Sequence, residues 1–73
     1  MPMTTHSARI TGPVIYAKPD GTKSEIPLGP CLVEQMSQNL VDIIWGAQGQ
    51  SSASLPVDEV EAAAEQGHLV LLD

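Results

Sequence analysis

Apolar and polar residues alternate along most of this chain with a period of two, the period of a β-strand that has one buried face. The clearest case is Leu40–Trp45, in which Val41, Ile43 and Trp45 fall on one face. Weaker runs predict further short strands over residues 9–17, 24–28, 31–37 and 52–55. The polar, glycine-containing residues 46–52 predict a loop that leads from Trp45 to the last of these strands.

Two short segments punctuate the first half of the chain. Gly12-Pro13 interrupts the run over residues 9–17, and proline cannot donate a hydrogen bond to a ladder. This run therefore suits an edge strand or a bulge better than a central strand. Pro19-Asp20-Gly21-Thr22 combines the preset φ of proline with a glycine that accepts positive φ, which predicts a turn. We expect a hairpin in which residues 24–28 form the returning strand.

One stretch, residues 56–66, has the 3.6-residue period of a helix. Pro56 suits the first turn because its missing N–H would have no partner there, and the neighbouring acids Asp58 and Glu59 favour the positive end of the helix dipole. Gly67 follows as a residue that can adopt the left-handed conformation and end the helix. The side expected to be buried is made of small residues, Val57, Val60, Ala63 and Ala64.

The run Leu69–Leu72 is apolar on both faces of a strand, so we expect a central strand or one covered on both sides. Together the elements predict an α+β fold: a small, mostly antiparallel β-sheet or an SH3-like partial barrel, with one C-terminal helix followed by a buried strand. Residues 1–8 predict a flexible N-terminal tail, which leaves 9–73 as a single small domain. The expected core comprises Val14, Tyr16, Val41, Ile43, Trp45, Val60, Ala64, Leu69 and Leu71.

The composition narrows the function classes. Only three of the 73 residues are basic and the formal net charge is −6, so direct binding to nucleic-acid phosphates is not expected. No apolar run approaches the ~20 residues of a membrane span and no secretory signal is visible, so we expect a cytoplasmic protein without a membrane partner. The single Cys31 excludes an internal disulfide. With two distant histidines it makes a poor zinc set, so no metal or other cofactor is expected.

Four residues are candidates for an interaction face. Asp58, Glu61 and Glu65 form an acidic stripe on the predicted helix, which holds no Lys or Arg to pair with them. Such a stripe can dock a cationic partner, although most acidic stripes are simply solvated. Trp45 borders the 46–52 loop and is either a binding hot spot or the main anchor of the core. The scarcity of large side chains favours the core.

An enzymatic function would depend on Cys31 and His68. A nucleophilic cysteine needs a neighbouring base or positive charge, and neither histidine is near Cys31 in the sequence, which favours a packing role. His68 stands where an imidazole can cap free carbonyl groups at a helix C-terminus.

The leading hypothesis is a small, acidic, cytoplasmic protein that acts as a non-enzymatic protein-binding module. A thin core without disulfide or metal, together with open strand edges, also predicts self-association as a two-fold homodimer. One alternative is an acidic inhibitor or nucleic-acid mimic that occupies a basic site. The other is a small enzyme or ligand-binding subunit with its site at a homodimer interface, around Cys31, His68 and carboxylates.

Overall fold

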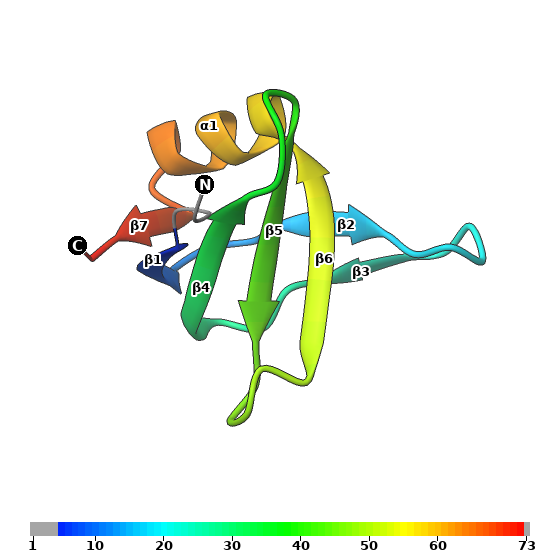
Figure 1. The fold of residues 1–73 in the computed structure, drawn as a ribbon, viewed down its shortest axis with the longest axis horizontal. Coiled ribbons are helices and arrows are strands. Elements are labelled where there is room, and N and C mark those ends of the chain that lie inside the picture. The colour runs from blue at the N-terminus through cyan, green and yellow to red at the C-terminus, as the bar shows by residue number, and fades with distance from the viewer. Residues whose placement is uncertain (1–4, 73) are drawn as a thin grey trace.

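A computed structural model describes residues 5–72 of the chain, and within them strands alternate with short turns until one helix follows near the C-terminus (Figure 1). The elements in chain order are β1 (Thr5–Ile10), β2 (Ile15–Ala17), β3 (Lys23–Glu25), β4 (Gly29–Gln35), β5 (Leu40–Trp45), β6 (Ser51–Pro56), α1 (Val57–Glu65) and β7 (Leu69–Leu71). The expected α+β class is confirmed, including the single helix and the strand that follows it.

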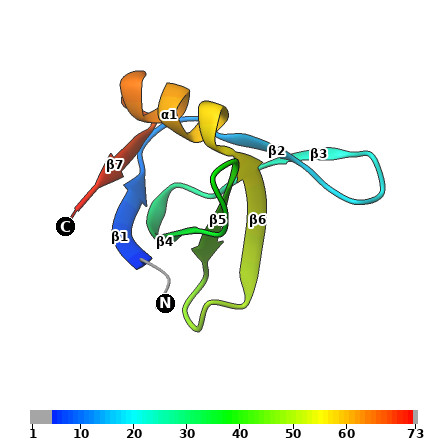
Figure 2. The ribbon, with the colours of Figure 1, turned by 45° about the horizontal axis from the view of Figure 1, so that its top comes forward.

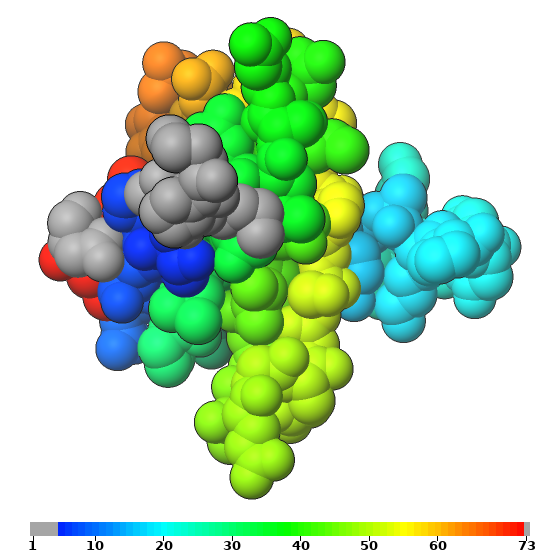
Figure 3. Space-filling view, viewed as in Figure 1, coloured from blue at the N-terminus to red at the C-terminus, as the bar shows by residue number. Residues whose placement is uncertain are grey.

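Five strands form the main sheet, in the order β6-β5-β4-β1-β7, and each neighbouring pair is antiparallel. Strands β2 and β3 pair only with each other and form a hairpin that extends past β6 (Figure 2). The space-filling view shows this hairpin and the β5–β6 loop projecting from the body of the molecule (Figure 3). The two edges of the main sheet are therefore β6, which contacts β2, and β7.

One face of the main sheet, here called the inner face, carries the core. Helix α1 crosses it and contacts β5, β6 and β7. The largest fully buried side chains are Ile10, Ile26 and Ile43. The other buried apolar residues are Ala8, Val14, Cys31, Val33, Val41, Ala53, Leu55, Val60, Ala63 and Leu69. No helix within residues 5–72 has the length and hydropathy to cross a membrane, since α1 has nine residues.

Most of the expected core residues are buried. The prediction is confirmed for Val14, Val41, Ile43, Val60 and Leu69. The two aromatic residues, Tyr16 and Trp45, are only partly buried and pack against the rim of the core. Ala64 and Leu71 are exposed, so these two assignments are wrong.

The start of α1 agrees with the predicted helix to within one residue. Pro56 adopts φ −59° and ψ 144° and immediately precedes the first helical residue, Val57. The N–H of Val57, which has no partner inside the helix, donates to the carbonyl oxygen of Asn39 at 2.9 Å. This bond ties the helix to the β4–β5 turn, because proline leaves no side-chain cap at this end.

The end of α1 is a Schellman motif around Gly67. Gly67 adopts the positive φ of 78° and its N–H donates to the carbonyl of Ala64 at 3.1 Å. The N–H of His68 donates to the carbonyl of Ala63 at 2.9 Å. The predicted stop at Gly67 is confirmed, and His68 caps the helix through its main chain, where the sequence suggested its imidazole.

The bend between β1 and β2 is tied to this helix end. The N–H groups of Thr11 and Gly12 donate to the carbonyl of His68 at 2.7 and 3.2 Å, and the Thr11 hydroxyl donates to the carbonyl of Gly67. The His68 ring lies so close to Gly12 that a Cβ there would be 2.4 Å from the ring atom Cδ2. A residue with a Cβ at position 12 would therefore force the His68 ring to move.

The predicted turn of the β2–β3 hairpin is confirmed. Gly21 has φ 91° and its N–H donates to the carbonyl of Lys18 at 3.0 Å. The Lys18 N–H donates to the carbonyl of Thr22 at 2.8 Å. Asp20 Oδ1 accepts from the Thr22 hydroxyl and N–H at 2.7 and 3.0 Å, and these bonds lower the pKa of Asp20.

The structure differs from the expected tail and edge strand at the N-terminus. Residues Thr5–Ala8, placed in the tail by the sequence, form the first part of β1, and Ala8 is buried. Residues 1–4 of the expected tail lie outside the described residues. The run over residues 9–17, expected to be an edge strand or a bulge, is divided: residues 9–10 end β1, which is internal between β4 and β7, whereas residues 15–17 form β2, which pairs only with β3. β1 ends at Ile10, before the interruption, so the missing N–H of Pro13 removes no bond from the main sheet.

The C-terminal strand lies at the predicted residues but not at the predicted position in the sheet. β7 is an edge strand that pairs only with β1, so the expectation of a central or doubly covered strand is wrong. Leu69 is buried beneath α1, whereas Val70, Leu71 and Leu72 are exposed. A strand sequence that is apolar on both faces thus predicts two apolar surfaces, but it does not predict which elements cover them.

Candidate functional site

The outer face of the main sheet, on the side away from α1, carries apolar residues at its centre. Because Cys31 and Val33 point into the core, Leu32 between them points outward, and the same alternation turns Ile44 outward from β5. Leu32 and Ile44 are direct cross-strand partners. Leu32 is 42% exposed, so this pair presents apolar surface to solvent.

The apolar surface continues across β1 to the end of β7. Ser7 is the β1 partner of Leu32, and the Leu72 N–H donates to the carbonyl of Ser7 at 2.8 Å. Leu72 is 57% exposed. We call the row Leu72, Ser7, Leu32 and Ile44 the outer strip.

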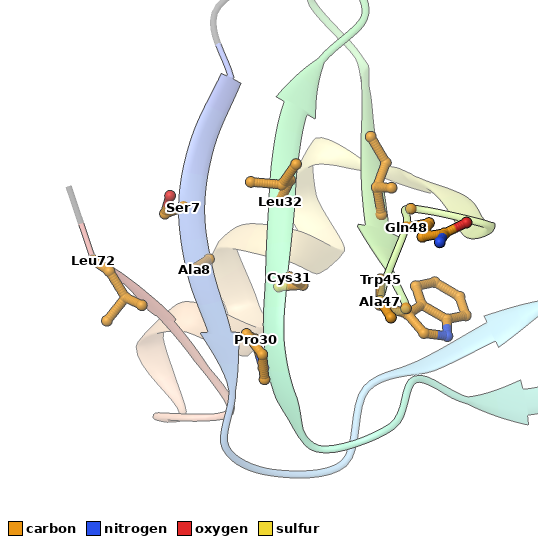
Figure 4. Close-up of a pocket in the computed structure, with 12 residues that line it drawn as sticks. Ser7, Ala8, Pro30, Cys31, Leu32, Trp45, Ala47, Gln48 and Leu72 are labelled. Atoms are coloured by element: carbon orange, nitrogen blue, oxygen red, sulfur yellow. The ribbon is translucent and has the colours of Figure 1, made fainter.

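A groove of about 570 Å³ lies along the outer strip and ends at the β5–β6 loop (Figure 4). The loop turns at Gly46 and Gly49, which have φ of 101° and 69°, and the Gly49 N–H donates to the Gly46 carbonyl at 3.2 Å. The Gln48 N–H donates to Gln50 Oε1 at 3.0 Å. These bonds shape the loop, whose residues Ala47 and Gln48 lie beside Trp45 at the end of the groove.

Charged residues border the outer strip. Glu34 and Asp42 are direct cross-strand partners in the row next to it, and both point outward. The Thr5 hydroxyl donates to Glu34 Oε2 at 3.1 Å, and the Ser54 hydroxyl donates to Asp42 Oδ1 at 2.5 Å. Two carboxylates that face each other across a pair of strands repel, so a cationic group placed over them would be stabilised.

Trp45 has a structural role and also borders this surface. Its ring meets the Tyr16 ring edge to face, with centroids 5.6 Å apart and planes at 61°. Trp45 packs against the core and also lines the groove. Helix α1 starts next to Leu40, five residues from Trp45, or about 17 Å along the strand. The structure therefore does not unite Trp45 with the acidic stripe.

The acidic stripe lies on the other side of the molecule. Asp58, Glu61 and Glu65 are exposed on α1, which covers the inner face, whereas the groove is on the outer face. The last turn of α1 holds no basic residue. The sequence-predicted face is thus two separate surfaces, an acidic helix and the rim of an apolar groove.

Cys31 and His68 do not form a pair. Cys31 is buried, and this burial raises the pKa of its thiol, which disfavours the nucleophilic thiolate. Cys31 is the partner of Ala8 on one side of β1, while His68 bonds to Thr11 three residues further along, on the other side. The register therefore separates them by about 10 Å along the strands as well as by the width of β1. Within residues 5–72 no cluster of histidine, cysteine and carboxylate side chains is arranged to hold a metal ion.

Sequence reasoning missed Leu32, Ile44 and Leu72. A signal was present, because Ile43 and Ile44 are consecutive and the strand therefore has an apolar residue on each face.

Comparisons with protein-family models, with curated proteins and with solved structures give no match to this chain.

Proposed function

We propose that the protein is a non-enzymatic protein-binding module that receives an apolar segment of another protein on the outer face of its main sheet. The single observation that carries the proposal is the groove of about 570 Å³ along the outer strip, which no element within residues 5–72 covers. An antiparallel sheet with one solvated face usually alternates apolar inward and polar outward residues. Here Leu32 and Ile44 break that rule at the centre of the solvated face.

Glu34 and Asp42, on one side of the outer strip, favour a basic side chain of the partner there, whereas Arg9 lies in the row on the other side of the strip. Glu34 and Asp42 face each other next to the outer strip, and a lysine or arginine beside the partner's apolar segment would relieve their repulsion. Electrostatic complementarity of this kind contributes to specificity and association rate. We place the module in the cytoplasm, because a lone cysteine thiol suits a reducing compartment.

The exposed carboxylates of α1 support a second candidate function, an acidic inhibitor or nucleic-acid mimic. Asp58, Glu61 and Glu65 are all exposed, and the chain offers only three basic residues to balance nine acidic ones. A protein of this kind would occupy a basic site mainly through charge, so its binding would weaken steeply with salt.

The test is affinity capture with the immobilised full chain in host lysate, comparing the wild type with Leu32→Ser and Met36→Ser. Met36 has a similar exposed fraction at the end of β4, outside the groove, and is the matched control. The proposal predicts a protein that the wild type and Met36→Ser capture equally and that Leu32→Ser captures at least about tenfold less.

Equal capture by all three proteins would contradict the outer face as the binding surface. A partner lost instead with the combined Asp58→Asn, Glu61→Gln and Glu65→Gln variant, and lost from the wild type at high salt, would support the acidic inhibitor. Thermal unfolding of each variant checks that it is folded.

A further inference from the structure

The free edge of β7 offers main-chain hydrogen-bonding groups to solvent. The Leu72 N–H donates to Ser7, and the His68 carbonyl accepts from Thr11, so residues 68, 70 and 72 direct their main-chain groups toward β1. The intervening Leu69 and Leu71 consequently direct their N–H and C=O groups away from β1. Leu71 is exposed, whereas Leu69 is only 3% exposed, so the accessible main-chain groups of this edge are chiefly those of Leu71. No other strand among residues 5–72 pairs with this edge.

The side chains at this edge are apolar and exposed. Val70, Leu71 and Leu72 are 43%, 54% and 57% exposed, and β7 has no charge, proline or bulge to prevent pairing. The opposite edge is protected: β6 is rich in serine, ends at Pro56, and packs beside β2. Natural proteins seldom leave a bare apolar edge strand open, which makes β7 the exception in this fold.

We propose that β7 pairs antiparallel with β7 of a second copy of this chain, across a two-fold axis at Val70. In this register Leu69 of each copy faces Leu71 of the other, and the two pairs exchange the main-chain hydrogen bonds of all four residues. Val70 faces Val70 of the partner copy as a non-hydrogen-bonded pair. Two five-stranded sheets then form one continuous sheet.

The strand itself favours a second copy over a foreign strand. Leu69-Val70-Leu71 reads the same in both directions, so a two-fold antiparallel pair places leucine against leucine and valine against valine. One isologous contact also closes the open edge of both copies at once.

A cavity beside the edge strengthens the same contact. It has a volume of about 440 Å³, lies between α1 and the inner face, and includes Leu69 and Leu71 in its wall. In the proposed register Leu71 of the second copy lies beside Leu69, where it extends this apolar wall. The partner copy thus covers side chains as well as main-chain groups.

The net charge of the two copies opposes dimerisation, and it therefore predicts how the dimer responds to salt. Two copies each carry a formal charge of −6, so raising the salt concentration screens their repulsion and strengthens the dimer. The proposed acidic inhibitor would respond to salt in the opposite direction. The dimer also does not depend on the outer-face partner, so each proposal can fail alone.

Sedimentation equilibrium of the wild type, Val70→Lys and Leu28→Lys tests the proposal. Leu28 is 71% exposed away from β7 and serves as the control for an added charge. We expect the wild type and Leu28→Lys to approach twice 7.7 kDa at high concentration, more readily at high salt. Val70→Lys should dimerise at least about tenfold more weakly. A monomeric wild type at millimolar concentration would overturn the proposal.

Disulfide trapping then tests the register. In Val70→Cys the facing Cα atoms lie about 4.5 Å apart, a distance that a disulfide can span. In Leu72→Cys, on the same outer side, the two cysteines lie about 14 Å apart along the strands. Under mild oxidation Val70→Cys should give a covalent dimer, while Leu72→Cys and the wild type, whose Cys31 is buried, should not. Equal trapping at both positions, or none at position 70, would overturn the proposed register.

Discussion

The inner and outer faces of the main sheet differ in how fully they are covered. On the inner face, Ile10 and Ile43 are almost completely inaccessible. On the outer face, Leu32 and Ile44 carry the same kind of side chain and remain accessible along an open groove. Within residues 5–72, apolar residues therefore lie on both faces of the sheet, and the helix covers only the inner face.

This difference shows what a chain of 73 residues can and cannot complete. A domain of this size buries only about 60% of its unfolded surface, so a second covering layer would need additional chain. Two uncovered apolar surfaces among residues 5–72 are the outer strip and the edge of β7, and these adjoin each other at Leu72. Both proposals follow from this, because each supplies from another molecule the cover that the fold lacks.

The largest expected effect comes from substituting adjacent residues on opposite faces. Ile43→Ala should lower the free energy of unfolding by about 2–5 kcal/mol, because it opens a cavity in the core. Ile44→Ala should cost only about 1 kcal/mol, because this side chain is already partly accessible. Urea denaturation measures both values. Equal losses in the free energy of unfolding would show that the two faces are buried alike and would contradict the difference between them.

A smaller loss is expected at the bend that brings β7 to the sheet. Gly12→Ala should destabilise the protein by about 1–3 kcal/mol, because the new Cβ would meet the His68 ring. In Gly12→Ala/His68→Ala the ring is absent, so the cost of adding the methyl group should largely disappear. A double-mutant cycle from thermal unfolding checks this coupling. Additive losses would contradict a contact between the new Cβ and the His68 ring.

The smallest expected effect is a pH dependence of the protein's stability, which arises from a buried thiol on the inner face. Burial raises the pKa of the Cys31 thiol in the folded protein, so the folded state holds this proton more tightly than the unfolded state. Its contribution is fully present below the unfolded thiol pKa of about 8.5 and is lost as pH rises through the folded pKa. Stability should therefore fall above about pH 8.5 in the wild type and fall less in Cys31→Ala.

Native Cys31 should also react with a thiol reagent at neutral pH far more slowly than the unfolded chain does. A fast native reaction would contradict the buried setting of this thiol and would revive an enzymatic role for it.

Local chemistry made the turns and the helix predictable from the sequence. Gly21 and Gly67 adopt positive φ as expected, because each position requires a conformation that glycine adopts most easily. The helix period was also clear, although it did not decide between Ala63, which is buried, and Ala64, which is exposed.

Strand order was not predictable, because it depends on contacts between residues distant in the sequence. The polar-looking Thr5–Ile10 became an internal strand, and the apolar Leu69–Leu71 became an edge. A strand sequence reports whether its faces are apolar, and it does not report which neighbour will pair with it. The groove was missed for the same reason, since it arises where β1, β4, β5 and the β5–β6 loop meet.

The claim that another chain completes this sheet can be tested most directly at two neighbouring amides of β7. The Val70 N–H points toward β1 and should exchange slowly at every protein concentration, whereas the Leu71 N–H points to the open edge. Amide hydrogen exchange followed by NMR should show Leu71 exchanging fast in dilute protein and at least about tenfold more slowly in concentrated protein. A Leu71 exchange rate that stays fast and independent of concentration would contradict the account.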